Sequence, residues 1–344
     1  MTTNSEQAQA SPTQESRVAA LARHRSSLIA HAVVVVALLV LQPFLSLGVV
    51  SVLMLCAVYG IYALGYEILF GFTNQCSLGQ SLFFGAGAYT VALLVERIHM
   101  NFLLAVLSAI ALGIVLGIVV GYLTVRLTEA YFVITTALFA TVVNLVATDM
   151  TWLTGGSNGL PFEIPPVHVG GLELSVYNNS VLYYGLILTV FAVYLILRII
   201  KRSKLGLVFM AIKENEGRVP FVGYNLFRYK WLAFIMSAAV TALGGALYAL
   251  RLRYVSVDFL GFEWSVIPVV WVLLGGSGTV VGPLLGVVVM VLFEYYVSAA
   301  LPSYLIVIGL LLMILMRWSP GGLMGYLSRI PEVVRRAVSR EVSS

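Results

Sequence analysis

One polar segment organises this chain, and it reads Lys201-Arg-Ser-Lys-Leu-Gly-Leu-Val-Phe-Met-Ala-Ile-Lys-Glu-Asn-Glu-Gly-Arg-Val-Pro-Phe-Val-Gly-Tyr-Asn-Leu-Phe-Arg-Tyr-Lys230. Seven of its residues are Lys or Arg and two are Glu, whereas the sequence on either side is almost entirely apolar. Basic loops between membrane spans stay on the cytoplasmic side, because Lys and Arg oppose translocation. We therefore expect residues 201–230 to form a cytoplasmic loop between two spans.

Within this loop, residues 207–215 have the pattern of a short amphipathic helix. We predict that Leu207, Phe209, Met210 and Ala211 form one apolar patch on it. Helix-breaking residues follow and mark the return of the chain to the membrane: Gly217, Pro220 and Gly223. A short cytoplasmic helix between spans would give a soluble partner a surface to push on, although a plain solvated loop would fit the same composition.

The composition identifies a membrane protein. Hydrophobic residues make up 60% of the chain and charged residues 10%, against about 25% charged residues in soluble domains. Cys56 and Cys76 have no CxxC spacing and the four histidines are scattered, so we expect neither a disulfide framework nor a metal site. The net charge of +5 lies in loops and tails, where membrane topology explains it better than nucleic-acid binding does.

Ten apolar runs approach or reach the length needed to cross a bilayer, which takes about 20 helical residues. They predict an all-α transmembrane bundle with spans at roughly 28–47, 50–70, 78–95, 102–125, 131–150, 181–200, 231–250, 265–280, 283–300 and 303–318, the eighth and ninth being short. Residues 1–27 and 319–344 are predicted to be cytoplasmic tails, the first of them disordered, around a transmembrane domain at 28–318. The first span is not preceded by the short n-region of a signal peptide and shows no clear cleavage site, so we expect it to be retained.

The charges of the loops agree with ten spans that start and end in the cytoplasm. The loop at 151–180 carries no Lys or Arg, whereas the 201–230 loop and the C-terminal tail are basic. Arg251 and Arg253 do not fit, because they fall in a short loop on the outer side. We expect them to reach the membrane interface or to pair with Asp258 or Glu263, unless the span count is wrong there.

Small residues recur at helical spacing in three stripes. Lipid gives helices no hydrophobic drive to associate, so close backbone approach through small side chains supplies the packing energy. We therefore interpret the stripes as helix-packing surfaces: Gly113, Gly117 and Gly121; Ser77, Ser81 and Gly85; and Gly278, Gly282 and Gly286.

Two further stretches go beyond packing, at 71–89 and 274–283. The front half of the first is polar and contains glycine although it lies between two spans, so its backbone is a candidate for irregular structure against protein or a water-filled cavity. In the second, Pro283 is suited to begin a helix, whose free N–H groups could receive a carboxylate. Ordinary tight turns between spans would explain both stretches equally well.

Six motifs occur in order along the chain: Gly71-Phe-Thr-Asn-Gln-Cys-Ser-Leu-Gly-Gln80 with Phe83-Phe-Gly-Ala-Gly-Ala-Tyr89, Tyr131-Phe-Val-Ile-Thr-Thr136, Thr154-Gly-Gly-Ser-Asn-Gly-Leu160, Ala211-Ile-Lys-Glu-Asn-Glu216, Tyr229-Lys-Trp-Leu-Ala-Phe234 and Gly275-Gly-Ser-Gly-Thr-Val-Val-Gly-Pro283. Together they resemble the permease subunit of ABC importers for branched-chain amino acids, of the M-type of the two paired permeases. The resemblance covers about residue 50 to Leu323, nearly the whole membrane part.

The resemblance implies a pore subunit of the bacterial plasma membrane, with no catalytic residues, cofactor or metal of its own. It implies alternating access and three kinds of partner: a homologous second permease, two cytoplasmic ATP-binding subunits and an extracytoplasmic substrate-binding protein. The sequence agrees in one respect, because it contains no GxxxxGK[ST] phosphate loop. The helix within 205–217 would be the coupling helix, which contacts an ATP-binding subunit through Gly206, Met210, Ala211, Ile212, Lys213, Glu214, Asn215 and Glu216.

For the substrate pathway the two polar stretches supply the candidates, together with one carboxylate inside a span. They are Glu67, Asn74, Gln75, Ser77, Gly79, Gln80, Gly275, Gly276, Ser277 and Gly278. A carboxylate within a membrane span is expensive and is by default a candidate for function.

The sequence departs from the family pattern at three positions. Gln80 and Ser81 replace a more usual His and Ala, and Glu67 stands where the family more often carries Asn. An acidic group would suit a substrate ammonium or an amide such as urea, so a permease for urea or short amides is the alternative. A transporter driven by an ion gradient is the alternative from another class, although few ionisable residues fall within the spans.

Overall fold

The computed structural model describes residues 31–165, 167–169, 172–174, 178–298, 309 and 321–325, and it divides the chain into two compact units, 1–46 and 47–344. Within the first, an apolar helical segment runs over His31–Phe44 and ends in a 3-10 turn, Gln42–Phe44, with Pro43 at its start. This segment covers most of the predicted first span.

The second unit is built of helices, as predicted. The long ones are α2 (Leu47–Thr73), α3 (Gln80–Ile98), α4 (Phe102–Thr124), α5 (Glu129–Asp149), α7 (Asn179–Arg202) and α9 (Leu226–Leu252). The shorter ones are α6 (Thr151–Thr154), α8 (Lys204–Glu214), α10 (Phe262–Gly275) and α11 (Gly282–Ser298). Two small antiparallel pairs complete it, β1 (Leu160–Pro161) with β4 (Tyr254–Val255) and β2 (Val167–Val169) with β3 (Leu172–Leu174).

Six of these helices are long and apolar enough to cross a membrane: α2, α3, α4, α5, α7 and α9. They match six of the predicted spans, and α10 and α11 are short, as expected of the eighth and ninth. The predicted tenth span, 303–318, lies outside the described residues apart from residue 309, and so do the tails except for 321–325. The all-α membrane class is therefore confirmed, whereas the count of ten spans stays a prediction.

Asparagines fix the starts of several helices. The Asn101 and Asn178 side-chain oxygens accept the N–H groups of Leu103 and Ser180, at 2.9 and 3.0 Å, at the beginnings of α4 and α7. Each bond satisfies one of the N–H groups that a helix leaves unpaired at its first turn. Helices α4 and α7 therefore begin where a polar connecting residue places a cap.

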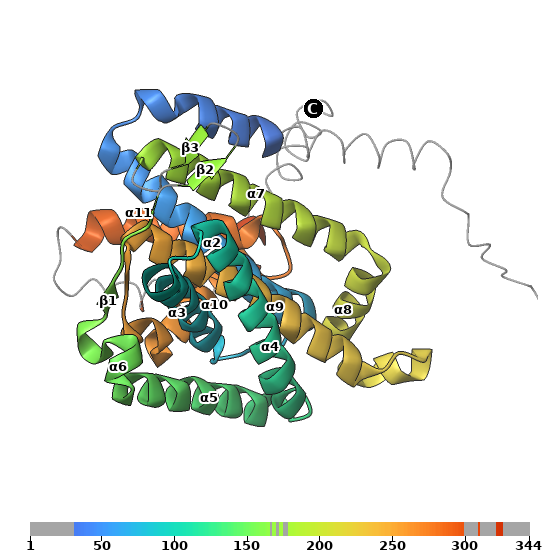
Figure 1. Ribbon diagram of the computed structural model, residues 1–344. Helices are drawn as coiled ribbons and strands as arrows, with labels where there is room; N and C mark the ends of the chain where they lie inside the picture. The colour runs from blue at the N-terminus through green and yellow to red at the C-terminus, as the bar shows by residue number, and fades with distance from the viewer. Residues whose placement is uncertain are drawn as a thin grey trace, which may run out of the picture. The chain divides into compact units, whose positions relative to one another are not determined.

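Helix α9 lies at the centre of the second unit and packs against α2, α3 and α4 (Figure 1). Glycines let the backbones meet: a Cβ on Gly245 of α9 would collide with the Phe84 carbonyl oxygen, and one on Gly87 of α3 with that of Ala242. The stripe Gly113, Gly117 and Gly121 of α4 faces the same helix. A Cβ on Gly113 would lie 2.5 Å from the Ala242 Cβ.

The loops that the charge pattern assigns to the same side of the membrane lie at the same end of the second unit. At one end, which we call the β1–β4 end, Asn144 donates to the Val257 carbonyl at 2.7 Å and the Tyr254 hydroxyl donates to that of Asn158 at 3.0 Å. At the other, the α8 end, α8 packs against the C-terminal part of α2 and the turn between α10 and α11. Spans that cross a membrane in alternating directions place every second loop on the same side, so this grouping agrees with the order of spans that the sequence predicts.

The two arginines that did not fit the charge pattern lie at the β1–β4 end. Arg251 donates to the carbonyl and hydroxyl oxygens of Ser51 at 3.2 and 2.9 Å, so it ties α9 to the start of α2. This is neither of the partners proposed from the sequence. Arg253 ends α9 in a left-handed conformation with φ 55°.

We predict that Gly245→Ala lowers the thermal melting temperature of the detergent-purified protein. The new methyl group collides with the Phe84 carbonyl and forces α3 away from α9, and overpacking of this kind destabilises by about 1–3 kcal/mol. Gly185→Ala in α7 is the matched control, because nothing lies within 4 Å of its Cβ position. Equal melting temperatures for the two variants would contradict the packing described here.

Candidate functional site

Helix α8 packs against the membrane helices by one face and exposes the other within the described part of the chain. Ser203 caps its start, and Val208, Phe209 and Ile212 are buried. Leu207 is 66% exposed and Ala211 and Glu214 are also exposed. The predicted patch is therefore wrong in grouping Phe209 with Leu207. The two side chains lie on opposite faces because consecutive helical residues are about 100° apart.

Six of the eight predicted coupling residues lie on α8 and divide between these two faces, whereas Asn215 and Glu216 follow the helix. Gly206, Ile212 and Lys213 face the membrane helices: a Cβ on Gly206 would collide with the Ile200 carbonyl, and the Lys213 ammonium donates to the Gly71 carbonyl at 2.8 Å. Asn215 caps the 3-10 helix Glu216–Val222, and Glu216 pairs with Lys230. The exposed face retains Ala211 and Glu214, with Met210 half-buried beside them.

The exposed surface continues beyond α8 onto the 3-10 helix. Phe221 is 92% exposed and Val222 is 73% exposed. Between the two helices lies a shallow pocket of about 290 Å³, lined by Ala211, Glu214, Asn215, Arg218, Val219 and Val222. We call Leu207, Ala211, Glu214, Phe221 and Val222 the α8 face. Large apolar side chains this exposed outside the spans indicate a surface for a partner.

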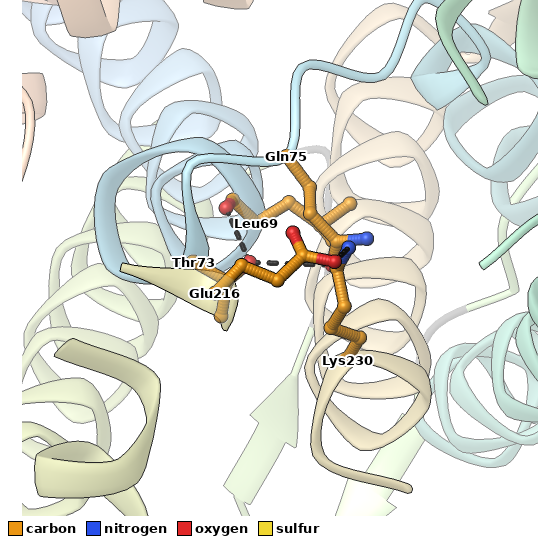
Figure 2. Close-up of polar contacts among 5 residues, drawn as sticks. All are labelled: Leu69, Thr73, Gln75, Glu216 and Lys230. Carbon is orange, nitrogen blue, oxygen red and sulfur yellow. Dashed lines mark hydrogen bonds and ion pairs between the residues drawn. The ribbon is translucent and has the colours of Figure 1, made fainter. Parts of the chain in front are cut away.

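The loop between α2 and α3 forms one wall of a second pocket. The Thr73 hydroxyl donates to the Leu69 carbonyl at 2.7 Å and lies 3.3 Å from the Gln75 side-chain oxygen, and Figure 2 shows these groups beside Glu216 and Lys230. Lys230 is buried and its ammonium lies 2.7 Å from the Glu216 carboxylate. The pocket holds about 400 Å³ and is lined by Phe70, Asn74, Gln75, Cys76, Leu127, Glu129, Ala130, Phe132, Val133, Glu216 and Lys230.

Three other pathway candidates are enclosed between helices. Gly79 lies against α5, where a Cβ would come within 2.5 Å of the Thr136 carbonyl oxygen. Ser77 is buried and accepts the N–H of Gly79 at 3.3 Å. Gln80 is buried too, and its side-chain oxygen accepts the Thr241 hydroxyl of α9 at 3.1 Å. These residues join α3 to α5 and α9, whereas Asn74 and Gln75 line the pocket.

The remaining candidates meet at the turn between α10 and α11. Residues 275–282 make a tight turn, and the Thr279 hydroxyl accepts the N–H of Gly282 at 3.0 Å where α11 begins. A Cβ on Gly275 would collide with the Gly282 carbonyl oxygen, and one on Gly286 with that of Trp271. A carboxylate of this chain does reach the turn, but not at the helix N-terminus suggested by the sequence: Glu67 accepts the N–H of Gly278 at 2.7 Å, four residues before α11 begins.

Sequence reasoning missed the polar partners that organise this end of the molecule. Lys201 donates to the Gly278 carbonyl at 2.5 Å, Thr136 accepts the N–H of Leu78 at 3.2 Å, and Lys230 pairs with Glu216. Lys201 and Lys230 flank the basic loop, so the positive charge that sets topology also supplies donors for the structure. No local pattern indicates which acceptor each one reaches.

Comparison with known proteins agrees with these features. The profile of one protein family, described as "Branched-chain amino acid transport system / permease component", matches residues 48–316. The high-affinity branched-chain amino acid transport system permease protein LivM of Escherichia coli (strain K12) is 29% identical over 318 residues, covering 84% of this chain and 74% of the relative. A probable branched-chain amino acid transport permease protein LivM of Methanocaldococcus jannaschii is 25% identical over 328 residues, covering 81% and 94%. No solved structure matches the chain.

We predict that Gly79→Leu lowers both the melting temperature and the amount of protein inserted in membranes. Its backbone conformation, with φ −113°, suits any residue, so the effect arises from collision with Thr136 and not from strain. Gly79→Ala should show a smaller loss in the same direction, because it adds only the Cβ. Wild-type stability of the leucine variant would mean that α3 and α5 are not in contact there.

Proposed function

The chain belongs to the family of permease components of branched-chain amino acid transport systems, and we propose that it forms one half of the membrane path of an ATP-driven importer for branched-chain amino acids. The observation that carries this proposal is the family match over 48–316, which takes in every long helix from α2 to α9 and the α10–α11 hairpin. The relatives named above share that description of their substrate.

The second half of the path would come from a homologous permease. Helix α5 is the candidate for contact with that second permease. It is the least buried of the six long helices, which is expected of a helix at the edge of the chain. Its apolar side chains follow one another at helical spacing along the exposed face: Tyr131, Ile134, Leu138, Val142 and Leu145. Such a stripe suits lipid or a neighbouring helix. Substrate would pass through the seam between the two permeases, which rock between inward-open and outward-open states.

The α8 face would dock on a cytoplasmic ATP-binding subunit. It is apolar at Leu207, Phe221 and Val222, and carries charge at Glu214. The opposite face of α8 supports transmission of force, because Phe209 is fully buried and α8 packs on α2 and α7. Closure of two ATP-binding subunits would move α8, and α8 would move these helices. Hydrolysis itself would take place on the partners.

The basic 201–230 loop supports placing the α8 end in the cytoplasm. Both chain termini would then be cytoplasmic, with tails at 1–27 and 319–344 around a transmembrane domain at 28–318, in a bacterial plasma membrane. The β1–β4 end would face outward and receive the substrate-binding protein. Affinity would belong mainly to that protein, since a tight site in the pore would slow release.

Urea or a short amide is not favoured as the substrate. Glu67 was the reason to consider one, and its carboxylate is buried against the α10–α11 turn with one oxygen bonded to Gly278. An ion-coupled transporter is not favoured either, because the family is one of permease components.

We predict that cells lacking this gene lose uptake of labelled leucine and keep uptake of labelled urea, and that the restored gene returns leucine uptake. The parallel measurement with urea is the control for substrate class. Loss of urea uptake alone would retain the permease and overturn its substrate.

We also predict that Leu207→Asp or Phe221→Asp abolishes copurification of the ATP-binding subunits with the tagged chain and stops leucine uptake. Each places a carboxylate in the apolar part of the α8 face, and neither side chain supports the fold. Trp152→Asp is the control, because Trp152 is 68% exposed at the β1–β4 end. Wild-type copurification in both α8-face variants would show that the partner docks elsewhere.

A further inference from the structure

Three charged side chains lie around the α10–α11 turn at the α8 end of the bundle. Glu67 comes from α2, Lys201 from the end of α7 and Lys213 from α8. The Glu67 carboxylate is 0% exposed, and the two lysines are partly buried. We call these three residues the charged link. Four elements contribute to it or are bonded by it, since both Glu67 and Lys201 bind Gly278 in the turn between α10 and α11.

Hydrogen bonds satisfy only part of the Glu67 carboxylate. Oε1 accepts the Gly278 N–H at 2.7 Å, while Oε2 has no hydrogen-bond partner among the described residues. Burial of a carboxylate without compensation is strongly unfavourable. The two ammonium groups act on it without pairing with it, because they donate to neighbouring carbonyls: Lys213 to Gly71 at 2.8 Å and Lys201 to Gly278 at 2.5 Å.

Two glycines make room for this arrangement. A Cβ on Gly71, one turn after Glu67, would collide with the Glu67 carboxylate group. A Cβ on Gly278 would lie 2.7 Å from the Lys213 Nζ, and Gly278 has φ +87°, which side chains disfavour. The Glu67 carboxylate and the Lys213 ammonium therefore each lie against Gly278 of the turn.

We propose that the charged link transmits displacement of α8 to the α10–α11 hairpin and to α2, which makes Glu67, Lys201 and Lys213 positioning residues for transport. This inference rests on the proposed function. The apolar side chains of α8 can slide past their neighbours. An ammonium near a buried carboxylate resists removal, because each charge would then remain in a low-dielectric site without the other. Lys213 is bonded directly to α2 through the Gly71 carbonyl, one turn after Glu67, so displacement of α8 is passed to α2 at that point.

The test is a double-mutant cycle on the complete complex reconstituted in proteoliposomes. Glu67→Gln keeps the shape and an acceptor for Gly278, and Lys213→Met keeps the stem and removes the charge. Each single variant should lower the amount of leucine taken up per ATP hydrolysed by about fivefold or more, the lower limit of typical coupling between sites. The double variant should do no worse than Lys213→Met alone, because removal of the buried carboxylate relieves its unpaired charge.

Lys230→Met provides the matched control, since its ammonium pairs with Glu216 and not with Glu67. Combined with Glu67→Gln, its effect on the uptake ratio should be additive. Two results would overturn the charged link in a wild-type complex that transports leucine. One is additive effects of Glu67→Gln and Lys213→Met, and the other is a wild-type uptake ratio in the single variants. Absence of leucine uptake by the wild-type complex would instead refute the proposed function.

Discussion

Close backbone contact around α9 is the constraint on which this structure depends. Helices in a bilayer gain little by exchanging lipid for one another, so dispersion between closely packed backbones must hold them. Gly245 and Gly87 let α9 and α3 approach until carbonyl oxygens fill the space of a side chain. Gly113 and Gly117 bring α4 to the same helix. With α9 fixed, α2 and α3 are placed, and the polar groups at the α8 end can meet.

The spans could be predicted because their length is a local property of the sequence. The runs at 102–125 and 181–200 lie close to α4 and α7 as observed. The face that each helix presents could not be read in the same way, since lipid and protein both accept apolar side chains. On α8, outside the spans, the reason differs: Phe209 is fully buried and Leu207 is exposed, and because both are apolar, hydrophobicity alone does not show which one packs against the membrane helices. The partners expected for Arg251 were chosen by their charge, whereas its observed partner, Ser51, lies 200 residues away in the sequence.

The candidate site shows the same limit more sharply. The sequence picked out Glu67 as an unusual carboxylate and 274–283 as a break that could receive one, but it did not join them. The bond between Glu67 and Gly278 spans 211 residues and depends on how α2 and the hairpin pack. Its consequence is functional in our account, because Lys213 brings the proposed coupling helix to the same point. A charge that suggested substrate chemistry thereby becomes part of the connection between α8 and the membrane helices.

The energy source most directly distinguishes an ATP-driven importer from an ion-driven transporter of the same substrate. The complex purified through a tag on this chain can be placed in proteoliposomes with labelled leucine and its binding protein on the side of the β1–β4 end. Leucine accumulation should require ATP on the α8 side and should persist when sodium and proton gradients are collapsed. Accumulation driven by either gradient without ATP would contradict the assignment of this chain to an ATP-driven importer.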